Sequence, residues 1–141
     1  MPPCLRSPRQ AVIYLSVEQV LFLHDRLIEE TGGEHGMRDL GGLESALARP
    51  HAAFGDTEFY PDVFAKAAVL MDGLTRNHAF IDGNKRVSIS TAVLFLQVNG
   101  YRLTATNPEL EQFAIQVTTM KPSNDTIADW FRTKTVRTKS R

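Results

Sequence analysis

The chain has 141 residues, 43% of them hydrophobic, and a formal net charge of zero. A chain of this length can bury one hydrophobic core without disulfides or metals, so we expect a single domain. Its one cysteine, Cys4, cannot form an internal disulfide, which indicates a reducing compartment and a cytoplasmic protein. Residues 1–10 lack the apolar run of a signal peptide, and no later segment has the length of a membrane span, so no membrane contact is expected.

Positive charge is concentrated at the end of the chain. The last ten residues carry five of the 16 Lys and Arg residues, which leaves 11 basic residues against 16 acidic ones in the rest. A net acidic body is not typical of a DNA-binding domain, which displays a basic face. We therefore assign residues 1–13 to a flexible leader, 14–134 to the folded domain and 135–141 to a solvated basic tail.

Two helices are predicted in the first fifty residues. Ser16 and Gln19 have the spacing of a capping box, and apolar residues then recur at helical spacing until Gly32 and Gly33. His24 falls on this apolar stripe, where a hydrogen-bonded core histidine is the favoured interpretation. A second, short helix follows, capped by Asp39.

Residues 51–60 lack helical periodicity and contain Gly55, which predicts a loop or small hairpin that could act as a substrate flap. Its aromatic residues Phe54, Phe59 and Tyr60 either contact a target or pack under the loop. Pro61 then occupies a plausible first helical position.

Three further helical segments complete the prediction. Residues 87–91 alternate like a strand, but the apolar run continues to Asn99, so we interpret the segment as a central helix. Helices are also predicted from Asn107 and over residues 124–134, without strong strand signals. The predicted fold class is all-α, a compact bundle of about six helices with at most a small hairpin flap.

The segment His78–Arg86, HAFIDGNKR, combines a proton acceptor, a carboxylate, a glycine turn and two cations before the central helix. Gly83 could act as an N-cap, which would leave the amides after it free to bind an anion. His78 could accept a proton from a hydroxyl, and Asp82 could hold a divalent cation on phosphate oxygens. Taken one at a time, each of these residues also has a structural explanation, but together they favour a phosphate site.

This segment resembles the Fic/Doc superfamily motif H-x-F-x-[DN]-x-N-[GK]-R, and every constrained position is met. The flanking segments resemble the death-on-curing (Doc) branch in the same order, so the resemblance covers about residues 14–131. They are Gly32-Gly33, Gly36-Met37-Arg38-Asp39, Leu43–Leu47 and Asn99-Gly100-Tyr101.

The resemblance implies a helical fold, ATP and Mg²⁺ as cofactors, and phosphoryl transfer to a protein hydroxyl. It assigns His78 as general base and Asp82 as Mg²⁺ ligand, and Arg76 either stabilises the transferred charge or is a surface arginine. The phosphate-binding residues it implies are Gly83, Asn84, Lys85 and Arg86.

Two departures separate the chain from the Fic nucleotidyl transferases. These enzymes have glycine where Lys85 stands and a second arginine at the position of Ile89. In the Doc branch a lysine goes with a reversed nucleotide whose γ-phosphate lies near the histidine, which favours phosphoryl over AMP transfer. The alternatives are a Fic-type AMP, nucleotidyl or phosphocholine transferase and a catalytically idle helical binding module.

The partners are also implied by the resemblance. The Doc branch comprises toxins of type II toxin–antitoxin systems, with a threonine of elongation factor Tu as the family target. The chain lacks the inhibitory string [ST]-x-x-x-E-[GN], so we expect restraint by a cognate antitoxin, with DNA contacted only indirectly through it. We further expect the antitoxin to dock between the first and last helices.

Overall fold

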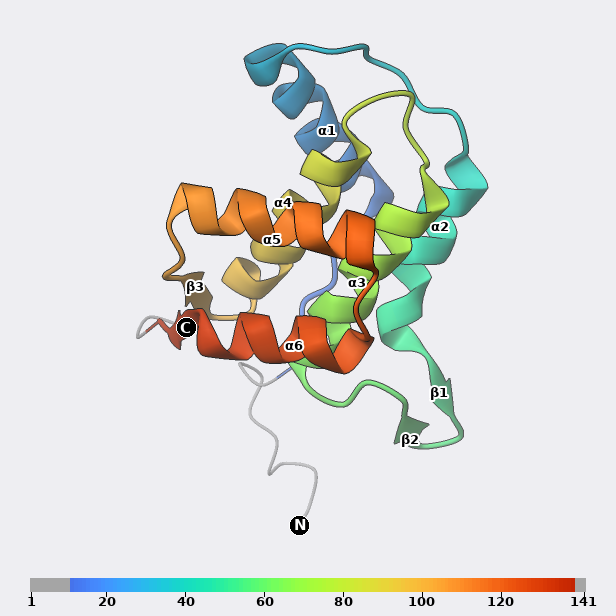
Figure 1. Ribbon diagram of the computed structural model, residues 1–141. Helices are drawn as coiled ribbons and strands as arrows, with labels where there is room; N and C mark the ends of the chain where they lie inside the picture. Colours follow the sequence, from blue (N-terminus) through green and yellow to red (C-terminus); the bar gives the residue numbers. More distant parts are fainter. Residues whose placement is uncertain (1–10, 139–141) are drawn as a thin grey trace.

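The computed structural model describes residues 11–138, so the leader residues 1–10 with Cys4, and residues 139–141 of the predicted tail, lie outside the described residues. Within them the chain forms six α-helices and two short antiparallel strand pairs (Figure 1), which confirms the predicted all-α bundle. In chain order the elements are α1 (Val17–Thr31), α2 (Leu40–Ala48), the 3₁₀ turn η3 (Arg49–His51), β1 (Ala53–Phe54), β2 (Thr57–Glu58), α3 (Val63–Asn77), α4 (Asn84–Val98), β3 (Tyr101–Leu103), α5 (Asn107–Met120), α6 (Asn124–Thr133) and β4 (Thr135–Arg137).

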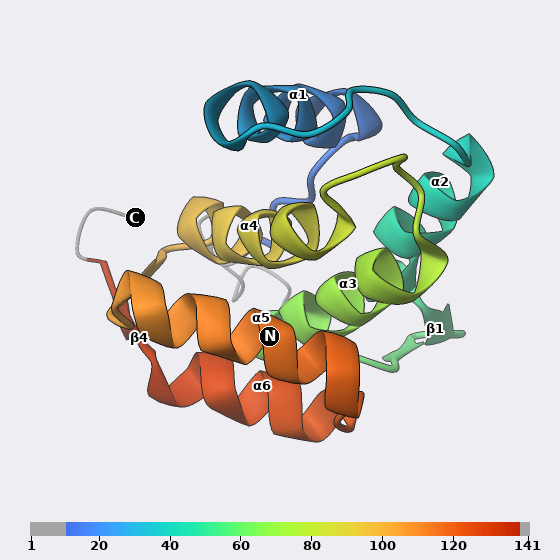
Figure 2. The same ribbon diagram turned by 45° about the horizontal axis from the view of Figure 1, so that its top comes forward.

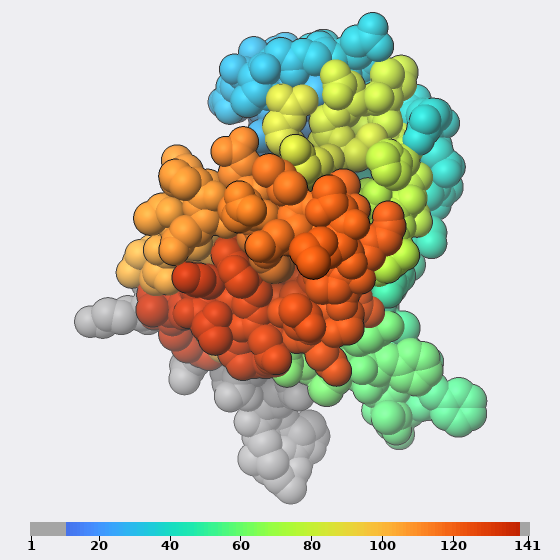
Figure 3. Space-filling view, in the orientation of Figure 1, coloured from blue at the N-terminus to red at the C-terminus, as the bar shows by residue number. Residues whose placement is uncertain are grey.

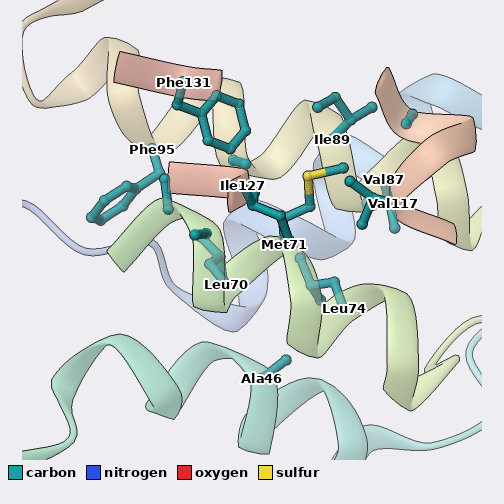
Figure 4. Packing of buried hydrophobic residues seen from close by; sticks show 14 of the residues in the cluster. Ala46, Leu70, Met71, Leu74, Val87, Ile89, Phe95, Val117, Ile127 and Phe131 are labelled. Atoms are coloured by element: carbon teal, nitrogen blue, oxygen red, sulfur yellow. The ribbon is translucent and has the colours of Figure 1, made fainter. Parts of the chain in front are cut away.

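Helix α3 is the centre of the fold. It packs against α2, α4 and α6, and an unbroken run of ten of its residues, from Lys66 to Thr75, is buried. Small residues allow the close approach, because a Cβ built on Gly73 would lie 3.1 Å from the Cβ of Ala46 on α2. Figure 4 shows Leu70, Met71 and Leu74 of α3 among the core side chains of α2, α4 and α6. Both chain segments that flank α3 are therefore anchored to a rigid element.

The helix starts follow the predicted capping chemistry, with one correction. Ser16 and Gln19 form the predicted capping box of α1, and the Asp39 carboxylate accepts the Gly42 N–H at the start of α2. The prediction that Pro61 opens α3 is wrong, because the helix begins at Val63 and Asp62 is its N-cap. The Asp62 carboxylate stabilises the helix start because it accepts a backbone N–H of the first turn. The side chain of Pro61 has no acceptor for such a bond.

The segment that could pass for a strand is helical, as predicted: residues 84–98 form α4. A second strand pair was not predicted. β3 pairs with β4, with Tyr101 opposite Arg137, and the Thr138 N–H donates to the Gly100 carbonyl oxygen at 2.8 Å. Residues 135–137 of the predicted tail are therefore part of the fold. Strands of three residues are too short to produce a recognisable alternation of apolar and polar side chains.

The expected docking groove between the first and last helices is wrong. Helix α1 packs on α4, whereas α6 packs on α3 and α1 lies on the opposite side of the bundle, as Figures 1 and 2 both show. Any apolar groove therefore has to be formed by other helix pairs. None of the helices in residues 11–138 combines the length and apolar character needed to cross a membrane.

Candidate functional site

The motif forms the loop between α3 and α4, and its backbone changes direction at both ends. His78 is the C-cap of α3 with a φ of 45°, in the left-handed region. Gly83 is the N-cap of α4 with a φ of 79°, a conformation that glycine adopts without a steric penalty. A non-glycine residue held at positive φ stores strain and is typical of functional sites. The loop therefore presents His78 and the start of α4 toward the same space.

Backbone hydrogen bonds hold this loop against the segment after α1. The Arg38 and Asp39 N–H groups donate to the Ala79 carbonyl oxygen at 2.7 and 3.0 Å, and the Ile81 N–H donates to the Gly36 carbonyl oxygen at 3.1 Å. Figure 1 shows the two segments side by side, the first in cyan and the loop in yellow-green. The loop is thus paired much like an edge strand, although both segments lie outside regular secondary structure.

Two side chains add to this support. Arg38 donates from Nη2 to the carbonyl oxygen of His78 at 2.8 Å. His24 of α1 stacks on Phe80 at a ring-centroid distance of 3.8 Å and places Nε2 2.7 Å from the carbonyl oxygen of Asp82. The prediction of a hydrogen-bonded core histidine at position 24 is confirmed. Its support of the loop between α3 and α4 is a role that the sequence analysis missed.

Asn84 uses its side chain within the loop. Its Oδ1 accepts the Phe80 N–H at 3.0 Å, and its Nδ2 donates to the Phe80 carbonyl oxygen at 2.9 Å. Both bonds close the loop over the buried Phe80 ring. The part of Asn84 that faces an incoming anion is therefore its backbone N–H in the first turn of α4.

Asp82 is held as a carboxylate by backbone donors. The Glu34 N–H donates to Oδ2 at 3.1 Å and the Gly83 N–H donates to Oδ1 at 2.8 Å. The hydrogen bond from Glu34, then that from Gly83, lowers the pKa of Asp82 below its ordinary value of 3.8, and nearby Arg86 acts in the same direction. Gly33 makes this approach possible, because a Cβ built there would lie 2.6 Å from Oδ2.

Most residues of the motif line one cavity of about 560 Å³. It gathers six of the seven predicted site residues, together with Ile81 and with Glu111 of α5. Glu111 lines the cavity but was missed, because a carboxylate on a distant helix carries no signal in the sequence. The predicted site residues in the cavity are His78, Asp82, Gly83, Asn84, Lys85 and Arg86.

Arg76, the seventh predicted site residue, is not among those that line this cavity. Its Nε donates to Asp72 Oδ1 at 2.8 Å, and the other oxygen of this buried carboxylate accepts from Arg49 at 3.0 Å. Asp72 thus links Arg76 to Arg49, the C-cap residue of α2. The role of Arg76 in stabilising transferred charge stays a prediction.

The start of α4 has the features of an anion site. Gly83 provides no side-chain cap, so within residues 11–138 the N–H groups of Asn84, Lys85 and Arg86 in the first turn have no hydrogen-bond partner. The helix dipole and two cationic side chains favour negative charge there. The guanidinium of Arg86 also donates to the hydroxyl of Thr31, the last residue of α1.

Asp82 has the donor type that Mg²⁺ requires. Mg²⁺ prefers oxygen ligands and is commonly bound through one or two carboxylates together with substrate phosphates and water. Among residues 11–138, three metal-type donors gather within 4.8 Å of one another only at Asp25, Glu29 and His35, all exposed on α1 and the loop after it. Exposed carboxylates often gather without an ion, so the fit to Mg²⁺ is better at Asp82, beside the anion site.

Comparison with known proteins agrees with this geometry. Residues 14–96 match the family model described as Fic/DOC family, which is more than half of the chain and includes the whole motif. The chain is 47% identical over 74 residues to Toxin Doc of Mycolicibacterium smegmatis, covering 52% of this chain and 57% of that protein. It is 34% identical over 119 residues to Protein kinase doc of Escherichia phage P1, covering 84% of this chain and 93% of that protein. The chain therefore belongs to the Fic/Doc family, in its death-on-curing branch.

Proposed function

We propose that this protein is the toxin of a type II toxin–antitoxin pair and acts as an ATP- and Mg²⁺-dependent protein kinase in the cytoplasm. The proposed substrate is a threonine of elongation factor Tu, whose phosphorylation would block translation. The observation that supports the proposal best is the single cavity shared by His78, Asp82 and the free N-terminus of α4. The names of the two relatives, one a toxin and one a protein kinase, support the same assignment.

His78 would act as the general base. It accepts the proton of the threonine hydroxyl as that oxygen bonds to the γ-phosphorus, while the bond from the γ-phosphorus to the β–γ bridging oxygen breaks and ADP leaves. The hydrogen bond from Arg38 to the His78 carbonyl oxygen fixes the backbone that carries the imidazole. No covalent intermediate with the enzyme is required.

The rest of the cavity would bind the nucleotide. The N–H groups after Gly83, with Lys85 and Arg86, would hold the phosphates, and Asp82 would hold Mg²⁺, which neutralises phosphate charge when bound. Since the pKa of Asp82 is lowered, its carboxylate is ionised over the physiological pH range. These groups are already in place, so little reorganisation would accompany binding.

Two positions favour phosphoryl transfer over AMP transfer. Lys85 adds a side chain and a charge where nucleotidyl transferases of the family have glycine. Ile89, at the position of their second arginine, is buried in the core, so it offers no cation to the nucleotide. A reversed nucleotide with its γ-phosphate beside His78 fits this arrangement.

The hairpin formed by β1 and β2 would align the target. We define the flap as residues 52–60; Figure 3 shows it projecting from the body of the molecule. Phe54 is 80% exposed and Phe59 is 57% exposed, so both rings are free to contact a protein substrate. A target segment could add to the hairpin by strand pairing.

The antitoxin would dock on a different surface. An apolar groove of about 420 Å³ runs beside α1, lined by Phe22, Leu23 and Leu27 of that helix and by Leu94 of α4. Phe22 is 64% exposed in it. Because α4 begins at the anion site and α1 ends at the hydroxyl that contacts Arg86, a segment bound there would lie close to the catalytic motif.

Phosphoryl transfer can be tested with γ-labelled ATP, Mg²⁺ and purified elongation factor Tu. The wild-type protein should transfer label, and His78→Ala should lower the rate about a hundred- to ten-thousand-fold, because general-base catalysis is lost. The exposed His35→Ala variant is the matched control and should retain the wild-type rate. Transfer of label only from α-labelled ATP would contradict the kinase assignment and indicate an AMP transferase. Nucleotide binding without any transfer of label would indicate a catalytically idle binding module.

The backbone clamp on Asp82 predicts a pH-dependent stability difference. The lowered pKa means that the ionised carboxylate stabilises the fold above its ordinary pKa of 3.8, and that this contribution is lost as pH falls through the lowered value. Asp82→Asn should therefore lower the urea midpoint at pH 7, and the difference from wild type should shrink below about pH 4. Asp56→Asn, at the exposed hairpin turn, should not change the midpoint at pH 7. A difference for Asp82→Asn that is independent of pH would contradict the clamp.

The antitoxin groove can be tested by calorimetry with the cognate antitoxin. Phe22→Glu should weaken binding at least about tenfold, because it places a charge in the centre of the apolar groove. Met120→Glu is the matched control, since Met120 is a comparably exposed apolar residue in a second groove between α5 and α6. Weaker binding by Met120→Glu together with unchanged binding by Phe22→Glu would assign the antitoxin to the second groove. Bound antitoxin should also raise the melting temperature of the wild-type protein by mass action.

A further inference from the structure

Lys66 is a charged residue that the proposed catalytic site does not use. It lies in α3 and its side chain is 0% exposed. Its ammonium group donates to Glu58 Oε1 at 2.6 Å, to the Tyr60 carbonyl oxygen at 2.6 Å and to the Pro50 carbonyl oxygen at 3.2 Å. An ammonium group has three N–H donors, and each therefore has an oxygen acceptor.

Two of the three acceptors belong to the flap, and the third lies just before it. Pro50 lies just before it, Glu58 is in its second strand and Tyr60 is its last residue. One buried charge on the central helix thus bonds to the chain just before the flap, to the second strand of the flap and to its last residue. Burying a charge is unfavourable unless it is fully paired, so this arrangement fixes the flap only in the geometry that supplies all three acceptors.

Aromatic contacts close the same region from the other side. The Lys66 ammonium lies 5.9 Å from the centre of the Tyr14 ring. Tyr14 in turn stacks on His51, the residue before the flap, at a centroid distance of 3.7 Å. The base of the flap is therefore held between the chain that leads into α1 and the buried lysine.

The flap has little structure of its own to keep this geometry. Each of its strands has two residues, and its turn passes through Gly55 with a φ of 62°. The Phe59 N–H donates to the Ala52 carbonyl oxygen at 3.0 Å and closes the hairpin. An isolated two-stranded hairpin is marginally stable in water, so its order depends on the contacts at its base.

We propose that Lys66 is the positioning residue of the flap: it holds residues 52–60 in the conformation that receives the protein substrate. Neither Lys66 nor the flap lines the cavity of the phosphate site. The inference rests on the proposed function, because it assigns the flap the role of aligning the target. Lys66 acts only through the flap and does not touch substrate. Its loss should therefore affect recognition of the protein target and leave nucleotide binding unchanged.

The first test is amide hydrogen exchange of the full chain, with Phe59 as the reporting amide. Lys66→Met keeps the length of the side chain and removes the charge, and it should speed exchange across residues 52–60 at least about tenfold while α4 stays protected. Glu58→Gln removes one partner from a half-exposed position and should have the same effect in smaller degree. If Lys66→Met fails to fold, amide exchange in Glu58→Gln decides whether Lys66 holds the flap. Lys134→Met, which removes a partly exposed ion pair with Glu109 at 3.5 Å, is the matched control.

The second test is steady-state transfer to elongation factor Tu. Both flap variants should raise the KM for the protein substrate at least about tenfold, with kcat and the KM for ATP within about twofold of wild type. An equal rise in the KM for the protein substrate and in the KM for ATP would indicate a general structural role for Lys66 and overturn the proposal. Unchanged exchange of the flap in a folded variant would also overturn it, even if the kinase is active. If the wild-type protein transfers no phosphate, the proposed function fails, and the exchange measurement still decides whether Lys66 holds the flap.

Discussion

The site depends on the backbone pairing between the segment after α1 and the loop between α3 and α4. Carbonyl oxygens and N–H groups of residues 36–39 bond to residues 79 and 81, and the Glu34 N–H reaches the Asp82 carboxylate. Neither segment is helical, so without this pairing their polar backbone groups would have no regular partners. The pairing holds the middle of the loop that joins the end of α3 to the start of α4. His78 and Gly83 lie at the two ends of this loop, as the C-cap of α3 and the N-cap of α4.

The bundle supplies the rigidity that this pairing requires. α3 is buried over most of its length and α4 packs against both α3 and α1, so the two ends of the loop between α3 and α4 are anchored to the core. The side chains of His24, Arg38 and Asn84 are committed to carbonyl oxygens of the loop. The groups that line the cavity beside the N–H groups of α4 are the His78 imidazole, two cationic side chains and the carboxylates of Asp82 and Glu111. Preorganised donors of this kind stabilise developing charge without a cost of rearrangement.

The parts that the sequence predicted are those encoded locally. Helix starts follow from a capping side chain and the residues just after it, as at Ser16 and Asp39. The motif is contiguous, so all six of the site residues predicted within it line one cavity. Comparison with known proteins then confirmed the family that the motif indicated.

The parts that the sequence did not predict depend on contacts between distant segments. The pairing of β3 with β4 joins residues that lie more than thirty positions apart, in strands of three residues. Glu111 reaches the cavity from α5, and Arg76 is drawn away from it by Asp72. The expected antitoxin groove failed for the same reason, because amphipathic patterns show that a helix has an apolar face and do not show which helix covers it.

In the proposed function, the loop between α3 and α4 would place the γ-phosphate of ATP beside His78. The most direct measurement is a crystal structure of the His78→Ala variant with Mg²⁺ and a non-hydrolysable ATP analogue. We expect the γ-phosphate beside position 78, with the phosphates on the amides that follow Gly83 and the metal ion on Asp82. An α-phosphate beside position 78, with the γ-phosphate directed away from it, would contradict the account and identify a nucleotidyl transferase.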